Sequence, residues 1–149
     1  MAKWTIKSLL YGTIDVTKDQ LVTGLDVGLE LPVPYLGFYL TDGTHKIVVD
    51  TGINAKYIVD GKAWADRPAA GGEDWVLKSL AEGKVEPEEV EMVIYTHLHN
   101  DHAGNCHLFP KAKHVFQDTE WKELLDPLPS MRIRGDFDQS LVPELSELD

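Results

Sequence analysis

Three histidines and one aspartate fall within six positions, directly after a short apolar run, and this constrains the fold more than any other feature of the 149-residue chain. The run covers residues 92–95 (MVIY), and the polar cluster lies in residues 96–105 (THLHNDHAGN). A continuous apolar run of this length is typical of a strand covered on both faces. The sequence therefore predicts a buried strand that leads directly into a metal-binding loop.

The spacing of the four polar residues limits the backbone of this loop. His97 and His99 are two positions apart, and such neighbours diverge on a helix, so they converge on one ion only from an extended or looped backbone. Asp101 and His102 come next, and a backbone that bends into a helix near Asp101 would turn this second pair toward an adjacent point. The spacing therefore indicates two metal positions close together.

The side-chain types indicate a borderline divalent ion. Neutral imidazole and carboxylate groups bind zinc, which we expect first, and they also bind iron or manganese. Such a metal lowers the pKa of a bound water toward neutrality and supplies the nucleophile for hydrolysis. Asp101 is the candidate catalytic residue, because it could both bind metal and pass a proton to the leaving group. The alternative, incidental loop residues, is disfavoured because so many polar groups after a strand have little packing use.

Composition narrows the classes of partner. The chain has 14 Lys and Arg against 25 Asp and Glu, a formal net charge of -11, which repels phosphate backbones and anionic lipid surfaces. We therefore expect neither nucleic acid nor membrane as a partner. The apolar patch near the N-terminus is too short for a spanning helix and lacks a signal-peptide core, so we expect a soluble, cytoplasmic protein.

Cysteine usage restricts the kind of metal site. Cys106 is the only cysteine, so the chain can form neither an intrachain disulfide nor a cysteine-rich zinc module. Any metal must be held by histidines and carboxylates. Cys106 itself is expected to be a small buried residue.

The remaining pattern predicts strands and helices in one domain over residues 1–149. Strands are expected at residues 4–11, 34–41, 46–50, 92–95 and 113–117, with a hairpin between 37–40 and 47–49 around the turn pair Asp42-Gly43. The strand after this turn ends at Asp50-Thr51-Gly52, which places a carboxylate at its carboxyl end. Trp4, Leu9, Tyr11, Tyr35 and Phe38 are expected in the core.

Two helices are expected, an amphipathic one over residues 73–82 and another over residues 118–125. The second should be capped by Asp118 or Thr119. Residues 54–72 predict a loop or short helical pieces, and the chain from residue 126 onward shows little sign of packed structure.

On these residues the sequence resembles the metallo-β-lactamase superfamily. Its hallmark, His-x-His-x-Asp-His, is matched in full by His97, His99, Asp101 and His102. The family's strand ending in Asp-Thr-Gly is matched by residues 47–52. Within the superfamily, the segment THLHNDHAGN, followed by Leu-Phe-Pro at residues 108–110, is most similar to the N-acyl-homoserine lactonase group.

The resemblance implies a role for each matched residue. His97 and His99 would hold one metal, and Asp101 and His102 the second. Asp50 would support the site from behind or hydrogen-bond a ligand, although it could also be a plain turn-capping residue. The implied fold is α/β (α+β): one sheet-plus-helix half, or slightly more, of the family's αββα sandwich.

The family's further ligands, two histidines and a bridging aspartate, have no counterpart here. His45, His107 and His114 do not match their contexts, and His114 is expected to be a partly exposed strand residue. Three explanations remain open: a truncated hydrolase, completion by another chain, or a metal-binding remnant without turnover. An uncovered sheet face would also favour self-association.

The leading function is a metal-dependent hydrolase, expected to carry two zinc ions, that opens a small ester or lactone such as an N-acyl-homoserine lactone. The alternatives are a thioester hydrolase of the hydroxyacylglutathione type, an iron-dependent relative and a catalytically inactive metal-binding fragment. The motif alone does not separate them.

Overall fold

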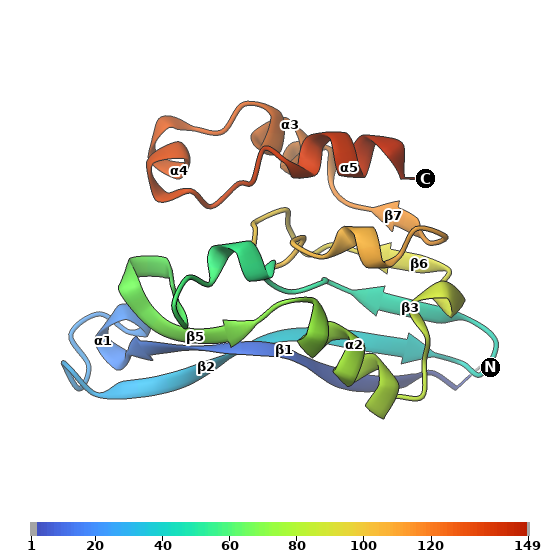
Figure 1. The fold of residues 1–149 in the computed structure, drawn as a ribbon, viewed down its shortest axis with the longest axis horizontal. Helices are drawn as coiled ribbons and strands as arrows, with labels where there is room; N and C mark the ends of the chain where they lie inside the picture. Colours follow the sequence, from blue (N-terminus) through green and yellow to red (C-terminus); the bar gives the residue numbers. More distant parts are fainter. Residues whose placement is uncertain (1–2, 149) are drawn as a thin grey trace.

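The computed structural model describes residues 3–148, which form a seven-stranded mixed sheet with helices packed beside it (Figure 1). The strands are β1 (Thr5–Thr17), β2 (Glu30–Thr41), β3 (Lys46–Val49), β4 (Lys62–Ala63), β5 (Arg67–Gly71), β6 (Met92–Ile94) and β7 (Lys113–Val115), in the spatial order β4-β5-β1-β2-β3-β6-β7. The α-helices are α1 (Lys18–Leu21), α2 (Glu73–Glu82), α3 (Asp118–Leu125), α4 (Pro129–Arg134) and α5 (Leu141–Glu147). Short 3-10 turns are η1 (Ala55–Tyr57), η2 (Trp64–Asp66), η3 (Pro87–Glu89) and η4 (Cys106–Leu108). The α/β prediction is confirmed.

The predicted hairpin is present, with β2 and β3 antiparallel and Phe38 opposite Val49. The first two strands run further than expected, because β1 and β2 pair along almost their whole length, from Thr5 opposite Thr41 to Thr17 opposite Glu30. Both predicted helices, α2 and α3, have the expected bounds. The predicted cap of α3 was wrong: the N-cap residue is Gln117, and Asp118 lies inside the first turn.

Three neighbouring strands of the sheet, β3, β6 and β7, are parallel. Val48 of β3 lies opposite Val93 of β6, which in turn lies opposite His114 of β7, all in parallel register. The carboxyl ends of parallel strands meet at one edge of a sheet, the usual place for a ligand site in open α/β sheets. The loops after β3 and β6 therefore leave the sheet side by side.

A bulge in β1 decides which side chains enter the core. The register with β2 shifts between Leu10 and Gly12. Before the shift, Leu9 is 3% exposed and Leu10 is 42% exposed, whereas after it Ile14 is only 7% exposed. Because one extra residue reverses the alternation of a strand, even-numbered residues face outward before the bulge and inward after it.

Helix α2 covers the inner face of the sheet and closes the edge of β1 at this bulge. Val76 and Leu80 pack in the same core as Leu9 and Val48. The Ser79 hydroxyl accepts a hydrogen bond from the backbone N–H of Leu10 and donates one to its carbonyl, both at 2.9 Å. The side chain thus satisfies backbone groups that a neighbouring strand would otherwise pair.

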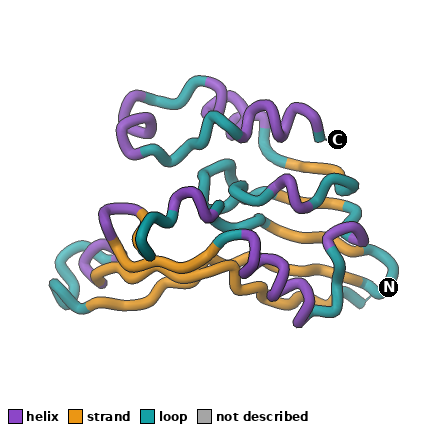
Figure 2. Tube along the Cα trace, viewed as in Figure 1, coloured by secondary structure: helices purple, strands orange, loops and turns teal. Residues whose placement is uncertain are grey.

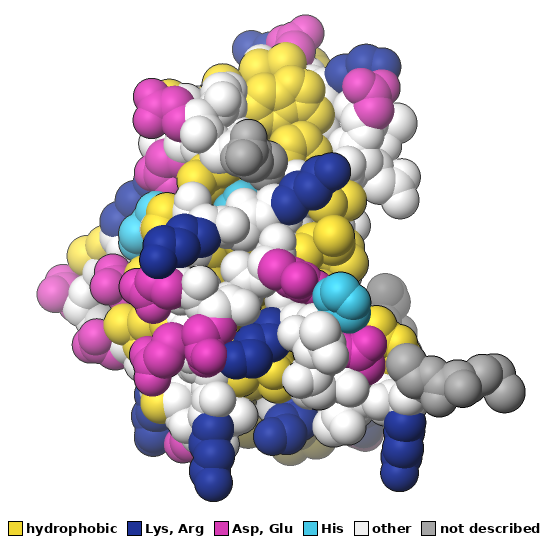
Figure 3. All heavy atoms as spheres, turned by 90° about the vertical axis from the view of Figure 1, so that its right-hand side faces the viewer, with side chains coloured by type: hydrophobic (Ala, Val, Ile, Leu, Met, Phe, Trp, Pro, Cys, Tyr) yellow, Lys and Arg dark blue, Asp and Glu magenta, His cyan; other side chains and the backbone are white. Residues whose placement is uncertain are grey.

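The opposite side of the β1–β2 hairpin, here called the outer face, is apolar and exposed. Ile6, Leu10, Leu36 and Phe38 define it, and they are 39% to 65% exposed. On another side of the molecule, the one at the right of Figure 1, hydrophobic side chains also reach the surface among charged ones (Figure 3). The core assignment was therefore wrong for Phe38, and also for Trp4, which is 45% exposed, whereas Leu9 and Tyr11 are buried as expected.

Two further predictions were wrong, one for the chain after residue 126 and one for residues 54–72. The segment after residue 126 is packed: α3, α4 and α5 lie together beyond β7 (Figures 1 and 2), and Leu141 and Leu145 are buried. Their spacing of four residues puts both on one helix face, but seven residues are too few for a clear periodic signal. Residues 54–72 contain the short strands β4 and β5 besides 3-10 turns, and β5 pairs with β1. Among the described residues, no helix combines the length and the apolar character that crossing a membrane requires.

Candidate metal centre

Two loops that leave the parallel strands are joined by backbone hydrogen bonds at the site. The N–H of Thr51 donates to the carbonyl of His102 at 2.6 Å, and the N–H of Gly104 donates to the carbonyl of Gly52 at 3.0 Å. Gly52 and Ala103 form a parallel bridge. The chain after β3 and the histidine loop after β6 thus behave as a short extension of the sheet, which holds His102 in place.

Asn105 and Gly104 strengthen this joint, and the sequence reasoning did not assign either a role. The buried Asn105 amide donates to the carbonyls of Thr51 at 2.8 Å and Ile53 at 3.0 Å. A Cβ at Gly104 would lie 2.4 Å from the backbone nitrogen of Asn54, so only glycine fits. The Gly-Asn pair that ends the motif was the available signal, but its partners lie about fifty positions earlier.

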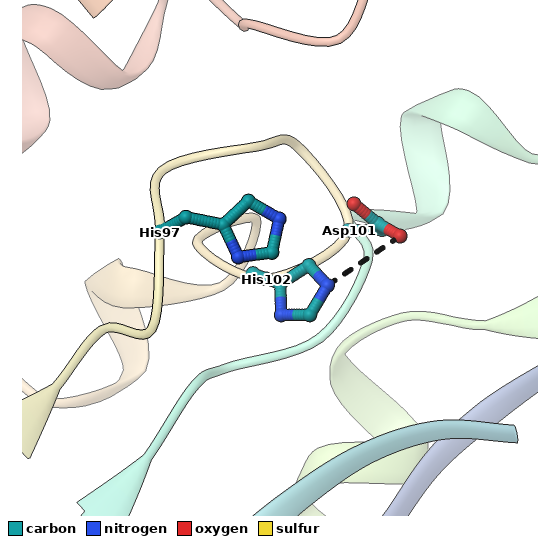
Figure 4. A group of neighbouring side chains, drawn as sticks. All are labelled: His97, Asp101 and His102. Atoms are coloured by element: carbon teal, nitrogen blue, oxygen red, sulfur yellow. Dashed lines mark ion pairs between the residues drawn. The ribbon is translucent and has the colours of Figure 1, made fainter. Parts of the chain in front are cut away.

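Three of the four predicted ligands converge (Figure 4). His97, Asp101 and His102 each offer a ligand atom, and these atoms all lie within 4.8 Å of one another. The rings of His97 and His102 have centroids 3.9 Å apart, and Nε2 of His102 is 3.8 Å from Oδ2 of Asp101. The backbone between them makes a single turn, in which the N–H groups of His102 and Ala103 both donate to the carbonyl of His99, and not the expected helix.

His99 lies beside this group and is not a member of it. Its ring centroid is 4.5 Å from that of His97, and its other side meets the ring of Phe137 edge-on at 4.8 Å. The expected pairs were His97 with His99 and Asp101 with His102. The structure brings one member of the first pair together with both members of the second, so the assignment of residues to two ions stays a prediction.

Asp50 lies directly behind the cluster. Its Oδ2 is 2.9 Å from Nδ1 of His102 and accepts a hydrogen bond from the Thr96 hydroxyl at 2.8 Å, while Oδ1 accepts from the Thr96 N–H at 2.8 Å. A carboxylate that accepts from Nδ1–H fixes the tautomer and leaves Nε2 free to bind a metal. Asp50 also has a φ of 60°, in the left-handed region that is rare for residues other than glycine. Thr96, which sequence reasoning missed, joins Asp50 to both imidazoles.

The electrostatics of the two histidines differ. Burial, followed by the charges of His102 and His99, lowers the pKa of His97. Burial also lowers the pKa of His102, but its hydrogen bond to the Asp50 carboxylate and the charges of Asp101 and Asp50 outweigh this effect, so this pKa lies above its usual value. The lowered pKa favours the neutral form of His97, which is the form that binds a metal.

The remaining histidines lie away from the cluster. His45 and His107 are exposed and face Glu91 and Glu73 respectively. His114 was expected to be partly exposed but is 8% exposed, because it points to the inner face of β7 and bonds Tyr95 at 2.8 Å and the Phe109 carbonyl at 3.0 Å. Cys106 is buried as expected.

A hollow of about 430 Å³ opens beside the cluster. Its polar lining includes His99, Asn100, Asp101, Arg134 and Asp136. Its apolar lining includes Ile14, Val16, Tyr35, Ile53 and Trp64, drawn from β1, β2, the loop after β3 and η2. A concave, mostly apolar space with a few convergent polar groups has the form of a small-molecule site.

The donor set fits the metal that the motif implies. Two imidazoles and one carboxylate, already gathered within 4.8 Å, are a set that zinc accepts in catalytic sites, and iron(II) accepts the same set. The orienting contact of Asp50 with His102 is also of the kind found behind metal-binding histidines. His97, Asp101 and His102 would hold the ion.

The family assignment rests on a match across most of the chain. The model of the metallo-beta-lactamase superfamily matches residues 32–145, which include all four loop residues and Asp50. The chain belongs to the metallo-beta-lactamase superfamily. This match confirms the resemblance and the partial αββα architecture.

Curated relatives match different shares of this superfamily member. The mouse metallo-beta-lactamase domain-containing protein 1 is 40% identical over 72 residues, which is 48% of this chain and 25% of that protein. The N-acyl homoserine lactonase AttM of Agrobacterium fabrum is 28% identical over 119 residues, or 74% of this chain and 44% of the lactonase. This chain therefore spans less than half the length of either protein.

Solved structures share the fold. An N-acyl homoserine lactone hydrolase with N-hexanoyl-L-homoserine bound at its catalytic metal centre superposes with a TM-score of 0.68 at 20% identity, covering 89% of this chain and 58% of that chain. The hydrolase AbOPH superposes with a TM-score of 0.59 at 20% identity, covering 99% of this chain and 54% of that chain.

Asp50→Asn tests the orienting contact. Asparagine tolerates the left-handed backbone, but it loses the negative charge that favours Nδ1–H of His102. We expect zinc affinity to fall by about ten- to a hundredfold, measured by competition with a chromophoric chelator. Asp74→Asn, which changes an exposed aspartate of α2, should leave the affinity unchanged. Equal affinities for the two variants would contradict the role given to Asp50.

Proposed function

We propose that this chain provides the metal-binding part of a hydrolase that opens a small ester or lactone, with N-acyl-homoserine lactones as the first candidates. The observation that carries the proposal is the convergence of His97, Asp101 and His102 at the carboxyl ends of parallel strands. The similarity to AttM, an N-acyl homoserine lactonase, supports the choice of substrate.

The proposed cofactor is zinc, with iron or manganese as alternatives and two ions in a complete site. A bound divalent cation would supply Lewis-acid activation of a water and of the substrate carbonyl. His97 and His102 would contribute imidazole nitrogens, with His99 beside them, and Asp101 a carboxylate oxygen. Because a catalytic zinc usually has three protein ligands, four residues do not complete two sites, and we propose that the remaining donors come from outside these 149 residues.

Asp101 is the proposed catalytic residue. Its carboxylate lies at the border between the metal ligands and the hollow, 3.8 Å from Nε2 of His102. A carboxylate in this position can take a proton from the attacking water and return it to the leaving alkoxide oxygen. The Asp50 carboxylate, on the far side of His102, keeps the imidazole oriented and takes no part in proton transfer to substrate.

The hollow suits the acyl part of the substrate. Its wall of Ile14, Val16, Tyr35 and Trp64 is apolar, and its volume of about 430 Å³ accommodates a small molecule. A substrate that lies with its apolar chain against this wall presents its ester group to Asp101. Hydrolysis of acyl-homoserine lactones in this way would quench quorum signals. We propose that the protein acts in the cytoplasm, where a lone thiol such as Cys106 stays reduced.

Metal content and turnover of the purified chain test this function together. We expect bound zinc by elemental analysis and slow opening of an N-acyl-homoserine lactone, because donors outside the chain are absent. Asp101→Asn should reduce this turnover by about 10²- to 10⁴-fold, while Asp74→Asn does not. Metal without turnover would favour the inactive metal-binding fragment, and absence of bound metal would remove the catalytic proposal for this chain.

We further propose that the chain self-associates, with a second copy covering the outer face. Ile6, Leu10, Leu36 and Phe38 are contiguous across the β1–β2 pairing, with Leu10 opposite Leu36. Two such faces can pack as stacked sheets, and a two-fold arrangement brings the same patch of each copy together. The charge of -11 opposes this contact, so association should strengthen as salt screens the repulsion.

Light scattering coupled to size exclusion tests the association. The wild-type chain should show a mass above that of one copy at about 0.15 M salt, a condition that screens exposed charges beyond roughly 8 Å. Phe38→Lys should shift it toward the monomer, whereas Ile133→Lys, at an 88% exposed position on α4, should not. A clean, stable wild-type monomer at this salt concentration would contradict the proposal.

A further inference from the structure

Three hydrogen-bond acceptors from separate parts of the chain bind one edge of the histidine segment, residues 96–100. Alternate N–H groups point to this edge: that of Thr96 donates to Oδ1 of Asp50 at 2.8 Å, that of Leu98 donates to Oε2 of Glu120 at 3.1 Å, and that of Asn100 donates to the carbonyl of Asp136 at 2.9 Å. Such alternation is the pattern of an extended strand whose partner is replaced by separate groups.

Leu98 is the middle of this edge and separates the two histidines. Its side chain is 0% exposed and belongs to the core, so the side chains of His97 and His99 on either side of it point away from the core. Any rotation of the Leu98 peptide would turn both imidazoles. The acceptor of the Leu98 N–H therefore controls the position of the histidine pair.

We propose that Glu120 is a positioning residue for the proposed metal ligand His97 and for His99 beside it. Glu120 is in the first turn of α3 and shares a helix face with Leu124, four residues later, which is buried in the core. The stacked rings of Phe116 and Trp121, with centroids 5.5 Å apart, hold the start of this helix against the end of β7. A fixed helix thus presents one carboxylate to the backbone of the ligand loop, and metal affinity depends on α3 although no residue of α3 is a proposed ligand.

The favourable charge of an acid in the first turn of a helix could by itself explain a glutamate here. Asp118 provides the control that distinguishes a favourable first-turn charge from a hydrogen bond to Leu98. It is an acid in the same turn, but its side chain is 74% exposed and pairs with Lys122 on the same helix. Replacing Asp118 removes a first-turn charge and leaves the Leu98 hydrogen bond in place.

The test compares zinc affinity for three variants of the chain. Glu120→Ala should weaken binding by about ten- to a hundredfold, the usual effect of removing a group that orients metal ligands. Glu120→Gln, whose amide oxygen still accepts from Leu98, should recover most of this loss, and Asp118→Ala should bind as the wild type does. Glutamine binding as weakly as alanine, or Asp118→Ala binding as weakly as Glu120→Ala, would overturn the proposal.

A second measurement does not depend on metal. In the metal-free chain, hydrogen exchange of the Leu98 amide, followed by NMR, should be faster in Glu120→Ala than in the wild type and near the wild-type rate in Glu120→Gln. This proposal rests on the proposed metal site, but the readouts separate the two: a wild type that takes up no zinc contradicts the proposed function, whereas unchanged Leu98 exchange in Glu120→Ala contradicts the role of Glu120.

Discussion

The joint between the end of β3 and the histidine loop is the interaction on which the rest of the site depends. Thr51 donates to His102 and Gly104 donates to Gly52, so the loop continues the parallel sheet beyond its last regular residues. Asn105 satisfies two further carbonyls that would otherwise be buried without a partner. An unpaired buried carbonyl costs roughly 1–3 kcal/mol, so this joint strongly favours one loop conformation.

Three possible metal ligands, His97, Asp101 and His102, are gathered by the fold itself, as the proposed metal site requires. Asp50 contacts the imidazole of His102 from behind and accepts a hydrogen bond from Thr96, and Glu120 accepts one from the N–H of Leu98, between His97 and His99. These contacts come from separate parts of the chain and form when the chain folds. The loop therefore loses its conformational entropy on folding and not on metal binding. The superfamily to which the chain belongs supports a metal-binding role for this geometry, and a hollow opens beside Asp101.

Features that depend on neighbouring residues in the sequence were predicted correctly. The histidine motif, the hairpin at Asp42-Gly43 and the helices over residues 73–82 and 118–125 could all be read from short windows of sequence. The outward position of Phe38 could not, because nearly every residue of β2 from 33 to 40 is apolar, so no alternation of apolar and polar residues shows which face of the strand is buried. The orienting partners were missed because they lie far away in the sequence: Asn105 bonds Thr51, 54 positions away, and Glu120 bonds Leu98, 22 positions away.

X-ray absorption at the zinc edge of the zinc-loaded chain tests the central claim most directly. The preformed site predicts a first shell of nitrogen and oxygen at about 2.0–2.1 Å, with the outer-shell signature of at least two imidazoles that is lost in His97→Ala combined with His102→Ala. A sulfur at about 2.3 Å would place the metal at Cys106, and a shell of oxygen alone would place it on surface carboxylates. Either result would contradict the account.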